Sequence, residues 1–271
     1  MIDIYQVFHD LPLREGNFAA ISGARKAAAG LDTSSQLFSE ALAQCQVTLL
    51  GSESYRVACQ QWNQRIQCCG HGLFAAAHAL LATGEHSRIS LGEGISAQRT
   101  PDPQGNLQTW LNLPALATVD IELPLWARTL ASQQGKQITP AGAAATTRAD
   151  GYLLLHIDNA VNIAELEVDL AAITRHTQQA VLLWQYQDKV VRMRYFAPQY
   201  GNDEDMATGS ALRVLAPHLQ RAAGLSSFDV IQCSSSGGRM TAKNTDDSVS
   251  ISGNIRLIES RDFRARWQVS T

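Results

Sequence analysis

Two stretches of this chain would form helices that are apolar on almost every side. The first runs from Gly70 to Gly84 and the second from Ser210 to Gly224. A helix that is apolar all round has to be buried all round, so each helix needs cover on every face. Strands wrapped around a central helix would provide that cover. Pro217 lies inside the second stretch and is expected to kink or interrupt the helix.

The two helices occupy matching places in the chain. Each half runs strand, Gly-containing turn, buried helix, terminal Gly and strand. Gly70 lies 14 positions before Gly84, and Gly209 lies 15 positions before Gly224. This similarity indicates an internal repeat of one supersecondary layout. The alternative is coincidence, because a helix followed by glycine is common.

Strands are predicted around these helices from alternation and from short apolar runs. Their expected ranges are 2–8, 18–21, 47–50, 55–60, 63–68, 88–91, 107–113, 152–157, 180–184, 190–196, 228–232, 239–242, 249–251 and 255–258. Two further helices are expected at 34–45 and 166–177. Pro114 and the Ala/Thr stretch after it indicate a boundary between an N-terminal α+β domain, 1–116, and a C-terminal α+β domain, 117–258. Packing of residues 259–271 back on the first domain is left open.

Composition removes several classes of function. Charged residues make up 17% of the chain and the net charge is −3, which does not favour nucleic acid or an anionic membrane as a partner. The N-terminus has neither a basic region nor a long apolar run, which predicts a cytoplasmic protein. Of the five cysteines, Cys68 and Cys69 are adjacent, a spacing poorly suited to a disulfide framework or a zinc site. Reduced thiols without a metal are therefore expected.

Gly-containing turns at the two helix starts are the strongest functional signal. The first amides of a helix have no carbonyl partner within the helix, and the helix dipole adds positive potential there. Such a point binds carboxylate or phosphate. Turns at Gly70-His71-Gly72 and Thr208-Gly209-Ser210 that face each other across a cleft would hold a small anionic metabolite from both sides.

Each side chain beside these turns has two possible roles, one functional and one structural. His71 suits general acid–base chemistry, or it forms only a local hydrogen bond. Asp205, Thr208 and Ser210 are ordinary helix-capping types, although Asp205 beside a His-bearing turn is also a candidate base. Cys69 precedes the first turn, where amides could lower a thiol pKa, and a buried inert cysteine is the alternative.

One stretch imitates a nucleotide-binding motif. Residues 92–97, GEGISA, follow a predicted strand as a dinucleotide fingerprint would, but polar residues and prolines follow instead of a helix. The stretch is therefore not read as a nucleotide site. The chain also lacks a Walker loop, a Gly-x-Ser-x-Gly elbow and a His-Glu-x-x-His motif.

Several motifs together resemble the PhzF-like family of phenazine-biosynthesis isomerase relatives, which shares the diaminopimelate epimerase fold. The resembling stretches are GNFAAI at 16–21, CGHGLFAAA at 69–77, YFAP at 195–198, EDMATGSA at 204–211, and Gln232 with Gly238-Arg239. The resemblance spans nearly the whole chain. It implies two similar domains, each a barrel-like, mostly antiparallel sheet around a central helix, with the site between them.

The resemblance also implies a chemistry. That chemistry is proton-transfer isomerisation at a carbon next to a carboxylate, without metal or organic cofactor, in a homodimer. The expected catalytic residues are His71 and Asp205. The expected substrate-binding residues are Asn17, Gly70, Gly72, Thr208, Gly209 and Ser210, with Cys69 as an additional thiol candidate.

Departures from the family pattern leave three hypotheses open. The family carries a proton-shuttling Glu in a segment that corresponds here to residues 44–50, which contain no carboxylate. Gly72 replaces the usual Ala, Met206 the usual Pro, and Cys233 the usual Gly. The protein is then an isomerase, a small-anion-binding relative that has lost chemistry, or a thiol-dependent enzyme that uses Cys69 opposite Thr208.

Overall fold

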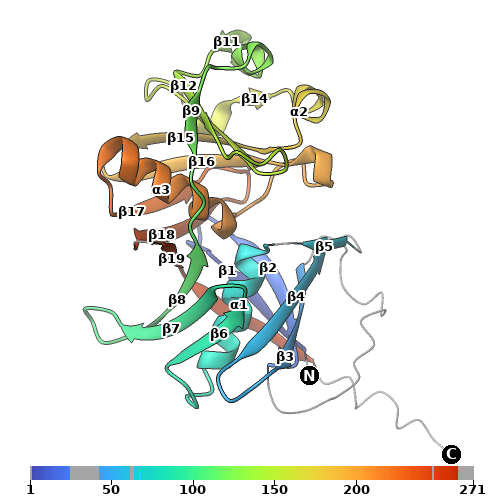
Figure 1. Ribbon diagram of the computed structural model, residues 1–271, viewed down its shortest axis with the longest axis vertical. Coiled ribbons are helices and arrows are strands. Elements are labelled where there is room, and N and C mark those ends of the chain that lie inside the picture. Colours follow the sequence, from blue (N-terminus) through green and yellow to red (C-terminus); the bar gives the residue numbers. More distant parts are fainter. Residues whose placement is uncertain (1, 25–42, 62–63, 67, 246, 262–271) are drawn as a thin grey trace, which may run out of the picture.

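The computed structural model describes residues 2–24, 43–61, 64–66, 68–245 and 247–261 (Figure 1). The described chain is mostly sheet with few helices. The strands are β1 (Ile2–Val7), β2 (Asn17–Ser22), β3 (Ala43–Leu49), β4 (Tyr55–Gln61), β5 (Gln64–Ile66), β6 (Arg88–Gly92), β7 (Ile95–Pro101), β8 (Leu107–Pro114), β9 (Val119–Ile121), β10 (Ala131–Gln133), β11 (Lys136–Ile138), β12 (Gly142–Ala145), β13 (Tyr152–His156), β14 (Glu167–Val168), β15 (Ala180–Gln187), β16 (Val190–Phe196), β17 (Ser227–Gln232), β18 (Gly238–Asn244), β19 (Ser248–Ser252) and β20 (Ile255–Arg261). The helices are α1 (Gly70–Leu81), α2 (Leu170–His176) and α3 (Leu212–Ala223), with 3-10 turns η1 (Leu125–Thr129), η2 (Ile163–Glu165), η3 (Pro198–Tyr200) and η4 (Gly209–Ala211).

The strands form three sheets. A 6-stranded sheet has the order β20-β1-β2-β3-β4-β5, and a small sheet has the order β11-β10-β14. An 11-stranded sheet has the order β6-β7-β8-β19-β18-β17-β16-β15-β13-β12-β9. Its β8–β19 pairing joins the two halves of the sequence, and β20 returns to pair with β1. Among the described residues no helix is long and apolar enough to cross a membrane.

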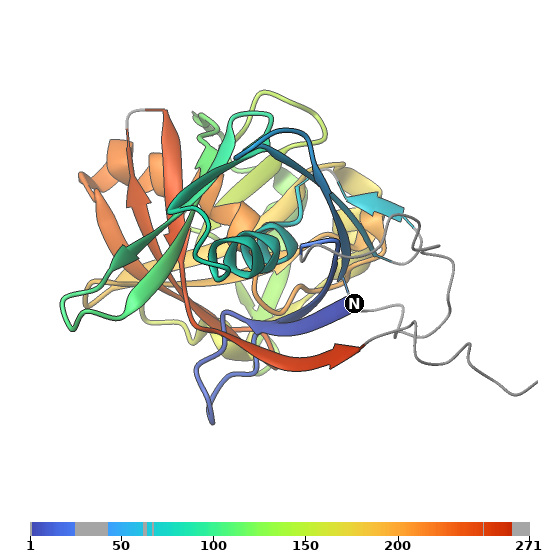
Figure 2. The same ribbon diagram turned by 90° about the horizontal axis from the view of Figure 1, so that it is seen from below.

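Helix α1 lies in the middle of the strands of the N-terminal half, as the all-round apolar pattern predicts. It contacts β1 to β4 on one side and β6 to β8 on the other, and the view along its axis shows the strands around it (Figure 2). Every residue of α1 except His78 is buried. The Nδ1 atom of His78 lies 3.1 Å from Thr109 Oγ1, which satisfies this polar side chain at the rim of the core.

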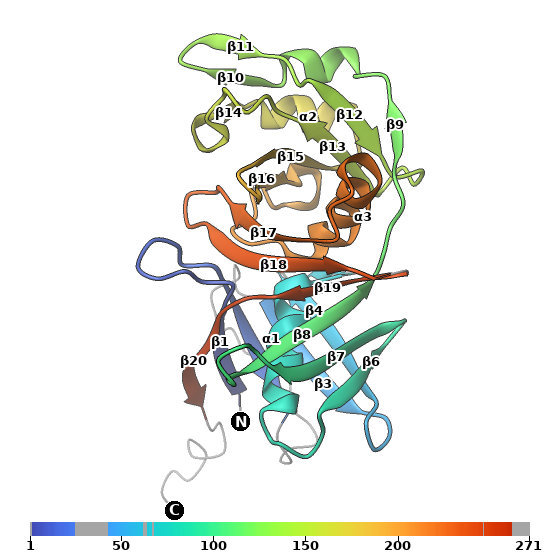
Figure 3. The ribbon, with the colours of Figure 1, turned by 90° about the vertical axis from the view of Figure 1, so that its left-hand side faces the viewer.

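Helix α3 is largely buried up to Leu219 and exposed at its end, so the prediction of a second helix that is apolar all round is wrong in its last turn. The helix packs against β18 and β19 (Figure 3), and residues 220–223 are exposed. Pro217 does not interrupt it. Proline removes the amide that would bond to the carbonyl of Arg213, and that carbonyl instead accepts a 2.8 Å hydrogen bond from Leu116 N. The segment that enters the C-terminal half therefore supplies the missing donor.

Two helix predictions need correction. The expected helix at 34–45 is wrong at residues 43–45, which open β3; residues 34–42 lie outside the described chain. Burial alternates along Ala43–Leu49, which is the strand period, and β3 pairs with β2 and β4. The helix expected at 166–177 begins only at Leu170, because Asp169 Oδ1 accepts from Ala172 N at 3.0 Å and caps it there.

The GEGISA stretch forms the turn of the β6–β7 hairpin. Both turn residues, Glu93 and Gly94, have positive φ angles of 52° and 75°, which matches the twist of a tight hairpin. The strand after it accounts for the absence of a helix at this place. Strands β7, β9 to β12 and β14 were not anticipated from the sequence, because most are only two to four residues long or polar.

Candidate active site

The starts of the two buried helices lie in direct backbone contact. A side-chain carbon built on Gly70 would overlap Ser210 N and would lie 2.9 Å from Gly209 C. Only glycine fits at this position, because the neighbouring atoms are backbone. The two Gly-containing turns predicted from the sequence are therefore brought together, and the contact itself leaves no room for a ligand between Gly70 and Ser210.

Two helix starts in contact concentrate positive potential. Each N-terminus carries about half a positive charge, so two adjacent ends favour a negative group beside them. The hydrogen-bond ladder of α1 begins with Leu73 N, which donates to Cys69 O at 2.9 Å. The amides of residues 70–72 precede that ladder and have no acceptor within the helix, which makes them the candidates for holding an anion.

Not every predicted amide of the second turn is available. Thr208 N donates to Gln232 Oε1 at 2.6 Å, and Ala211 N donates to Thr208 O at 3.2 Å. These two amides therefore already have acceptors within the protein. The amides of Gly209 and Ser210 are the candidates in this turn.

Asp205 is the carboxylate that faces the site. Its Oδ1 accepts from Asn17 Nδ2 at 2.9 Å, and its Oδ2 accepts from Thr208 Oγ1 at 2.6 Å. Its neighbour Glu204 is held instead by Arg194, whose Nε and Nη2 donate to the two carboxylate oxygens at 2.6 and 2.8 Å. Asp205 is thus linked to the opposite half of the chain, whereas Arg194, which holds Glu204, lies in the same half as Glu204.

Asn17 connects Asp205 with His71. Besides Asp205, its Nδ2 group donates to Ala207 O at 2.9 Å and lies 3.4 Å from His71 Nδ1. Protonated imidazole has no free lone pair, so the contact with His71 is a hydrogen bond only when that ring is neutral. Protonation of His71 is therefore coupled to the position of the Asn17 amide.

His71 is buried next to Cys69 and Asp205. Burial lowers the pKa of His71, but the charge of Cys69, the hydrogen bond with Cys69 and the charge of Asp205 outweigh burial and raise it to about 9. Cys69 Sγ lies 3.8 Å from His71 Nε2. A hydrogen bond with Cys45 lowers the pKa of Cys69, yet a hydrogen bond with Cys59 and burial leave it above the usual value. The charge of Cys69 is present only after this thiol has lost its proton, so Asp205 is the neighbour whose charge favours the imidazolium at neutral pH.

Gln232 fixes the loop that carries Asp205. This residue at the end of β17 is fully buried, and its Nε2 group donates to the Asp205 carbonyl and, at 3.0 Å, to Thr208 Oγ1. The sequence pointed to Gln232 only as part of a family motif and not as a site residue. The signal in the sequence that could have identified Gln232 is its position as a lone glutamine at the end of an apolar strand. A buried amide side chain needs hydrogen-bond partners, so such a glutamine is expected to hold neighbouring groups.

The structure also gathers cysteines that sequence reasoning kept apart. The sulfurs of Cys45, Cys59 and Cys69 lie within 4.8 Å of one another, and all three side chains are buried. A side-chain carbon on Gly72 would overlap Cys45 Sγ and would lie 2.9 and 3.1 Å from the other two sulfurs. Gly72 is thus needed for sulfur packing, which differs from the substrate-binding role predicted for it.

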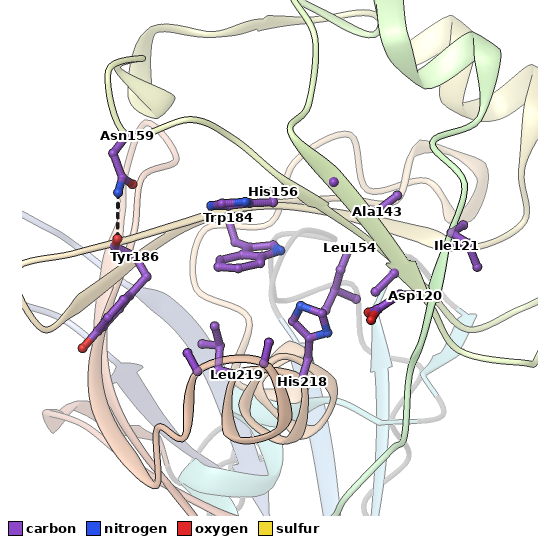
Figure 4. Close-up of a pocket in the computed structure, with 14 residues that line it drawn as sticks. Asp120, Ile121, Ala143, Leu154, His156, Asn159, Trp184, Tyr186, His218 and Leu219 are labelled. Atoms are coloured by element: carbon purple, nitrogen blue, oxygen red, sulfur yellow. Dashed lines mark hydrogen bonds between the residues drawn. The ribbon is translucent and has the colours of Figure 1, made fainter.

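A pocket of about 600 Å³ lies elsewhere, between α3 and strands β13 and β15 (Figure 4). Its lining includes His156, Trp184 and His218, and the His156 ring stacks on the Trp184 indole with centroids 4.3 Å apart. Burial lowers the pKa of both histidines, so these rings are neutral at neutral pH. The pocket contains none of the residues predicted for the site.

Comparison with solved structures defines the class of fold. The chain resembles a PhzF-family protein from Enterococcus faecalis with a TM-score of 0.75 and 19% identity, over 95% of this chain and 96% of the other. It also resembles a hydroxyproline epimerase from Agrobacterium vitis with a TM-score of 0.54 and 12% identity, over 95% and 91% of the two chains. The fold is therefore one that PhzF-like proteins share with epimerases.

Sequence comparison gives the family. The PhzC-PhzF family model, described as phenazine biosynthesis-like protein, matches residues 63–259, and the chain belongs to this family. An uncharacterized isomerase of Pseudomonas aeruginosa is 26% identical over 217 residues, which cover 78% of each chain. The resemblance inferred from the motifs is thus confirmed.

Proposed function

We propose that this protein is an isomerase that transfers a proton on a small metabolite bearing a carboxylate. The observation that carries the proposal is the meeting of two helix starts beside one imidazole, His71, and one carboxylate, Asp205. Membership of the PhzC-PhzF family and similarity to an isomerase support it. The proposed proton transfer uses neither a metal nor an organic cofactor.

In this proposal the ligand lies beside the Gly70–Ser210 contact. Its carboxylate accepts hydrogen bonds from the amides of residues 70–72 and from those of Gly209 and Ser210. Preorganised amides of this kind stabilise the enolate that forms when the α-proton leaves. Because the helix ends are already fixed by packing, they need no reorganisation during the reaction.

His71 and Asp205 handle the proton. Asp205 is held by Asn17 and Thr208 and acts as the base that removes the α-proton. The charge of Asp205 raises the pKa of His71 and favours its protonated form, which returns a proton to the enolate. Asn17 Nδ2 donates its two hydrogens to Asp205 and Ala207 and lies 3.4 Å from His71 Nδ1, so it holds the base close to the acid.

The proposal includes the remaining predictions about architecture and location. Residues 1–116 and 117–258 would be two similar domains, each a barrel-like sheet around its own helix, α1 and α3. The protein would act as a cytoplasmic homodimer, without nucleic-acid or membrane partners.

Exchange of solvent deuterium tests the chemistry. The purified protein is incubated in D2O with a panel of α-amino and α-hydroxy carboxylates, including trans-4-hydroxy-L-proline, which the Agrobacterium vitis epimerase binds. We expect one substrate class to gain deuterium at its α-carbon with wild type, and His71→Asn and Asp205→Asn to lose this activity. Asp203→Asn is the matched control, because Asp203 is exposed and lies two residues before the proposed base.

A second candidate function is small-anion binding without turnover. Residues 44–50 contain no carboxylate, and Cys45 stands in this segment beside the site. This function predicts that small carboxylates raise the Tm while no deuterium enters any of them. A panel that neither exchanges deuterium nor shifts the Tm would exclude both functions.

A further inference from the structure

Three cysteines far apart in the sequence converge next to the start of α1. Antiparallel register places Cys45 of β3 directly opposite Cys59 of β4, and Cys69 is the residue that precedes α1. Helix α1 packs on both strands, which brings the third sulfur to the other two. The exposed fractions are 2%, 5% and 4%, so these sulfurs have almost no contact with water.

The arrangement of the three sulfurs suits a metal ligand set. Cys45 Sγ and Cys59 Sγ are in hydrogen-bond contact, and Cys69 Sγ lies within 4.8 Å of both. A thiolate is the form of cysteine that binds metals. The sulfurs also fill the volume of an absent side chain at Gly72, so they point at one common place.

We propose that Cys45, Cys59 and Cys69 form a binding site for a thiophilic d10 metal ion, Cu(I) or Zn(II). Soft thiolate ligands select these ions from the divalent and monovalent metals of the cell. This site goes beyond the proposed isomerase function, which uses neither Cys45 nor Cys59.

Binding is a ligand exchange without oxidation or reduction. As the ion binds, water leaves it, and each of the three cysteines that is still a thiol releases its proton to solvent. In the Zn(II) arrangement a protonated His71 also releases one proton before its nitrogen binds. Cys45 Sγ and Cys59 Sγ are now 2.6 Å apart, whereas two thiolates on a tetrahedral ion with bonds of about 2.3 Å are separated by about 3.8 Å. One of these side chains therefore rotates about its Cα–Cβ bond when the ion binds.

The two ions differ in what they require of His71. Cu(I) is satisfied by the three sulfurs alone. Zn(II) takes a fourth ligand, and the imidazole beside the cluster lies 3.8 Å from Cys69 Sγ, near the roughly 3.6 Å expected between S and N ligands of one tetrahedral zinc. Binding of Cu(I) should thus leave His71 free, while binding of Zn(II) should engage it.

Metal competition tests the site with readouts that do not depend on any enzymatic activity. The reduced full-length protein is titrated without oxygen against a chromophoric Cu(I) chelator and, separately, against a Zn(II) chelator. We expect a one-to-one complex with at least one of the two ions. Cys59→Ser should lower the affinity for that ion by more than about 100-fold, which is the largest loss expected when a residue that only hydrogen-bonds to a metal ligand is removed. Cys68→Ser and Cys233→Ser are matched controls that should bind as wild type, because neither sulfur belongs to the cluster.

X-ray absorption then separates the two ions. Three sulfur neighbours indicate the Cu(I) arrangement, and three sulfurs with one nitrogen at about 2.0–2.1 Å indicate Zn(II) with His71. His71→Asn should weaken only the second. Circular dichroism shows whether each variant is folded. If Cys59→Ser does not fold, Cys45→Ser takes its place in the titration.

Two results would overturn the site. One is a wild-type protein that retains neither ion in competition with the chelators. The other is retention by Cys59→Ser or Cys45→Ser at the wild-type affinity. Because metal is measured directly, failure here leaves the deuterium-exchange result on the isomerase untouched.

Discussion

Replacing Gly70 with alanine tests the contact on which the candidate site depends. The added methyl group would overlap Ser210 N and would lie 2.9 and 3.1 Å from Gly209 C and Cα. All three atoms belong to backbone, so no side-chain rotation relieves the overlap. The two helix starts would have to move apart, and the cluster of amides beside them would widen.

The size of the effect follows from opposing contributions. Overpacking costs about 1–3 kcal/mol, and the upper end applies where backbone must shift. Alanine regains at most about 1 kcal/mol over glycine in a helix, and less at Gly70, the first residue of α1. The expected net loss is about 2 kcal/mol. At about 2–4 °C per kcal/mol for a protein near this size, the Tm should fall by about 4–8 °C.

Thermal and urea unfolding followed by circular dichroism measure this loss. Gly142→Ala is the matched control, because a side-chain carbon on Gly142 would meet no atom within 4 Å. The control should unfold close to wild type. If Gly70→Ala unfolds together with Gly142→Ala, the two helix starts do not touch, and the joint anion site has no structural basis.

Three further predictions concern the groups around that contact. Gln232→Leu leaves Thr208 N without an acceptor in a fully buried place and should lower the free energy of unfolding by about 3 kcal/mol in urea denaturation. Arg194→Met leaves Glu204 without its partner and should cost about 2 kcal/mol by the same measurement, less than the 3–5 kcal/mol of a fully buried pair. The pKa of His71 is raised above 6.5, so its contribution to stability is complete below pH 6.5 and is lost at higher pH as the ring gives up its proton. Above pH 6.5 the urea midpoint of wild type should therefore fall more than that of His71→Gln. Equal slopes for both proteins would contradict the raised pKa.

The sequence was sufficient for the parts of the fold that depend on one dominant pattern. An apolar stretch with cover needed on every side correctly predicted that α1 is buried. The two glycine turns were expected to face each other across a cleft, and the structure places them in direct backbone contact instead. The site side chains Asn17, His71 and Asp205 were found through motifs, and the structure joins them by hydrogen bonds.

What the sequence could not supply is long-range pairing. Residues 43–45 looked helical in isolation and became strand because β2 and β4 lie on both sides of them. Pro217 was expected to disturb α3, and only tertiary structure shows that Leu116 N satisfies the carbonyl that Pro217 leaves free. Cross-strand register likewise decides that Cys45 faces Cys59, which no spacing along the chain indicates.

The departures from the family pattern are connected through one small volume. Where the family stretch has Ala, this chain has Gly72, and the space of the missing methyl group is bordered by the sulfurs of Cys45, Cys59 and Cys69. Cys45 also belongs to the segment that lacks the family's carboxylate. Glycine at position 72 and the three thiols are therefore sterically dependent on each other, because a methyl group on residue 72 would collide with the sulfurs. The cysteine cluster and the altered acid–base segment are then one feature of this protein, and a function assigned to either must account for both.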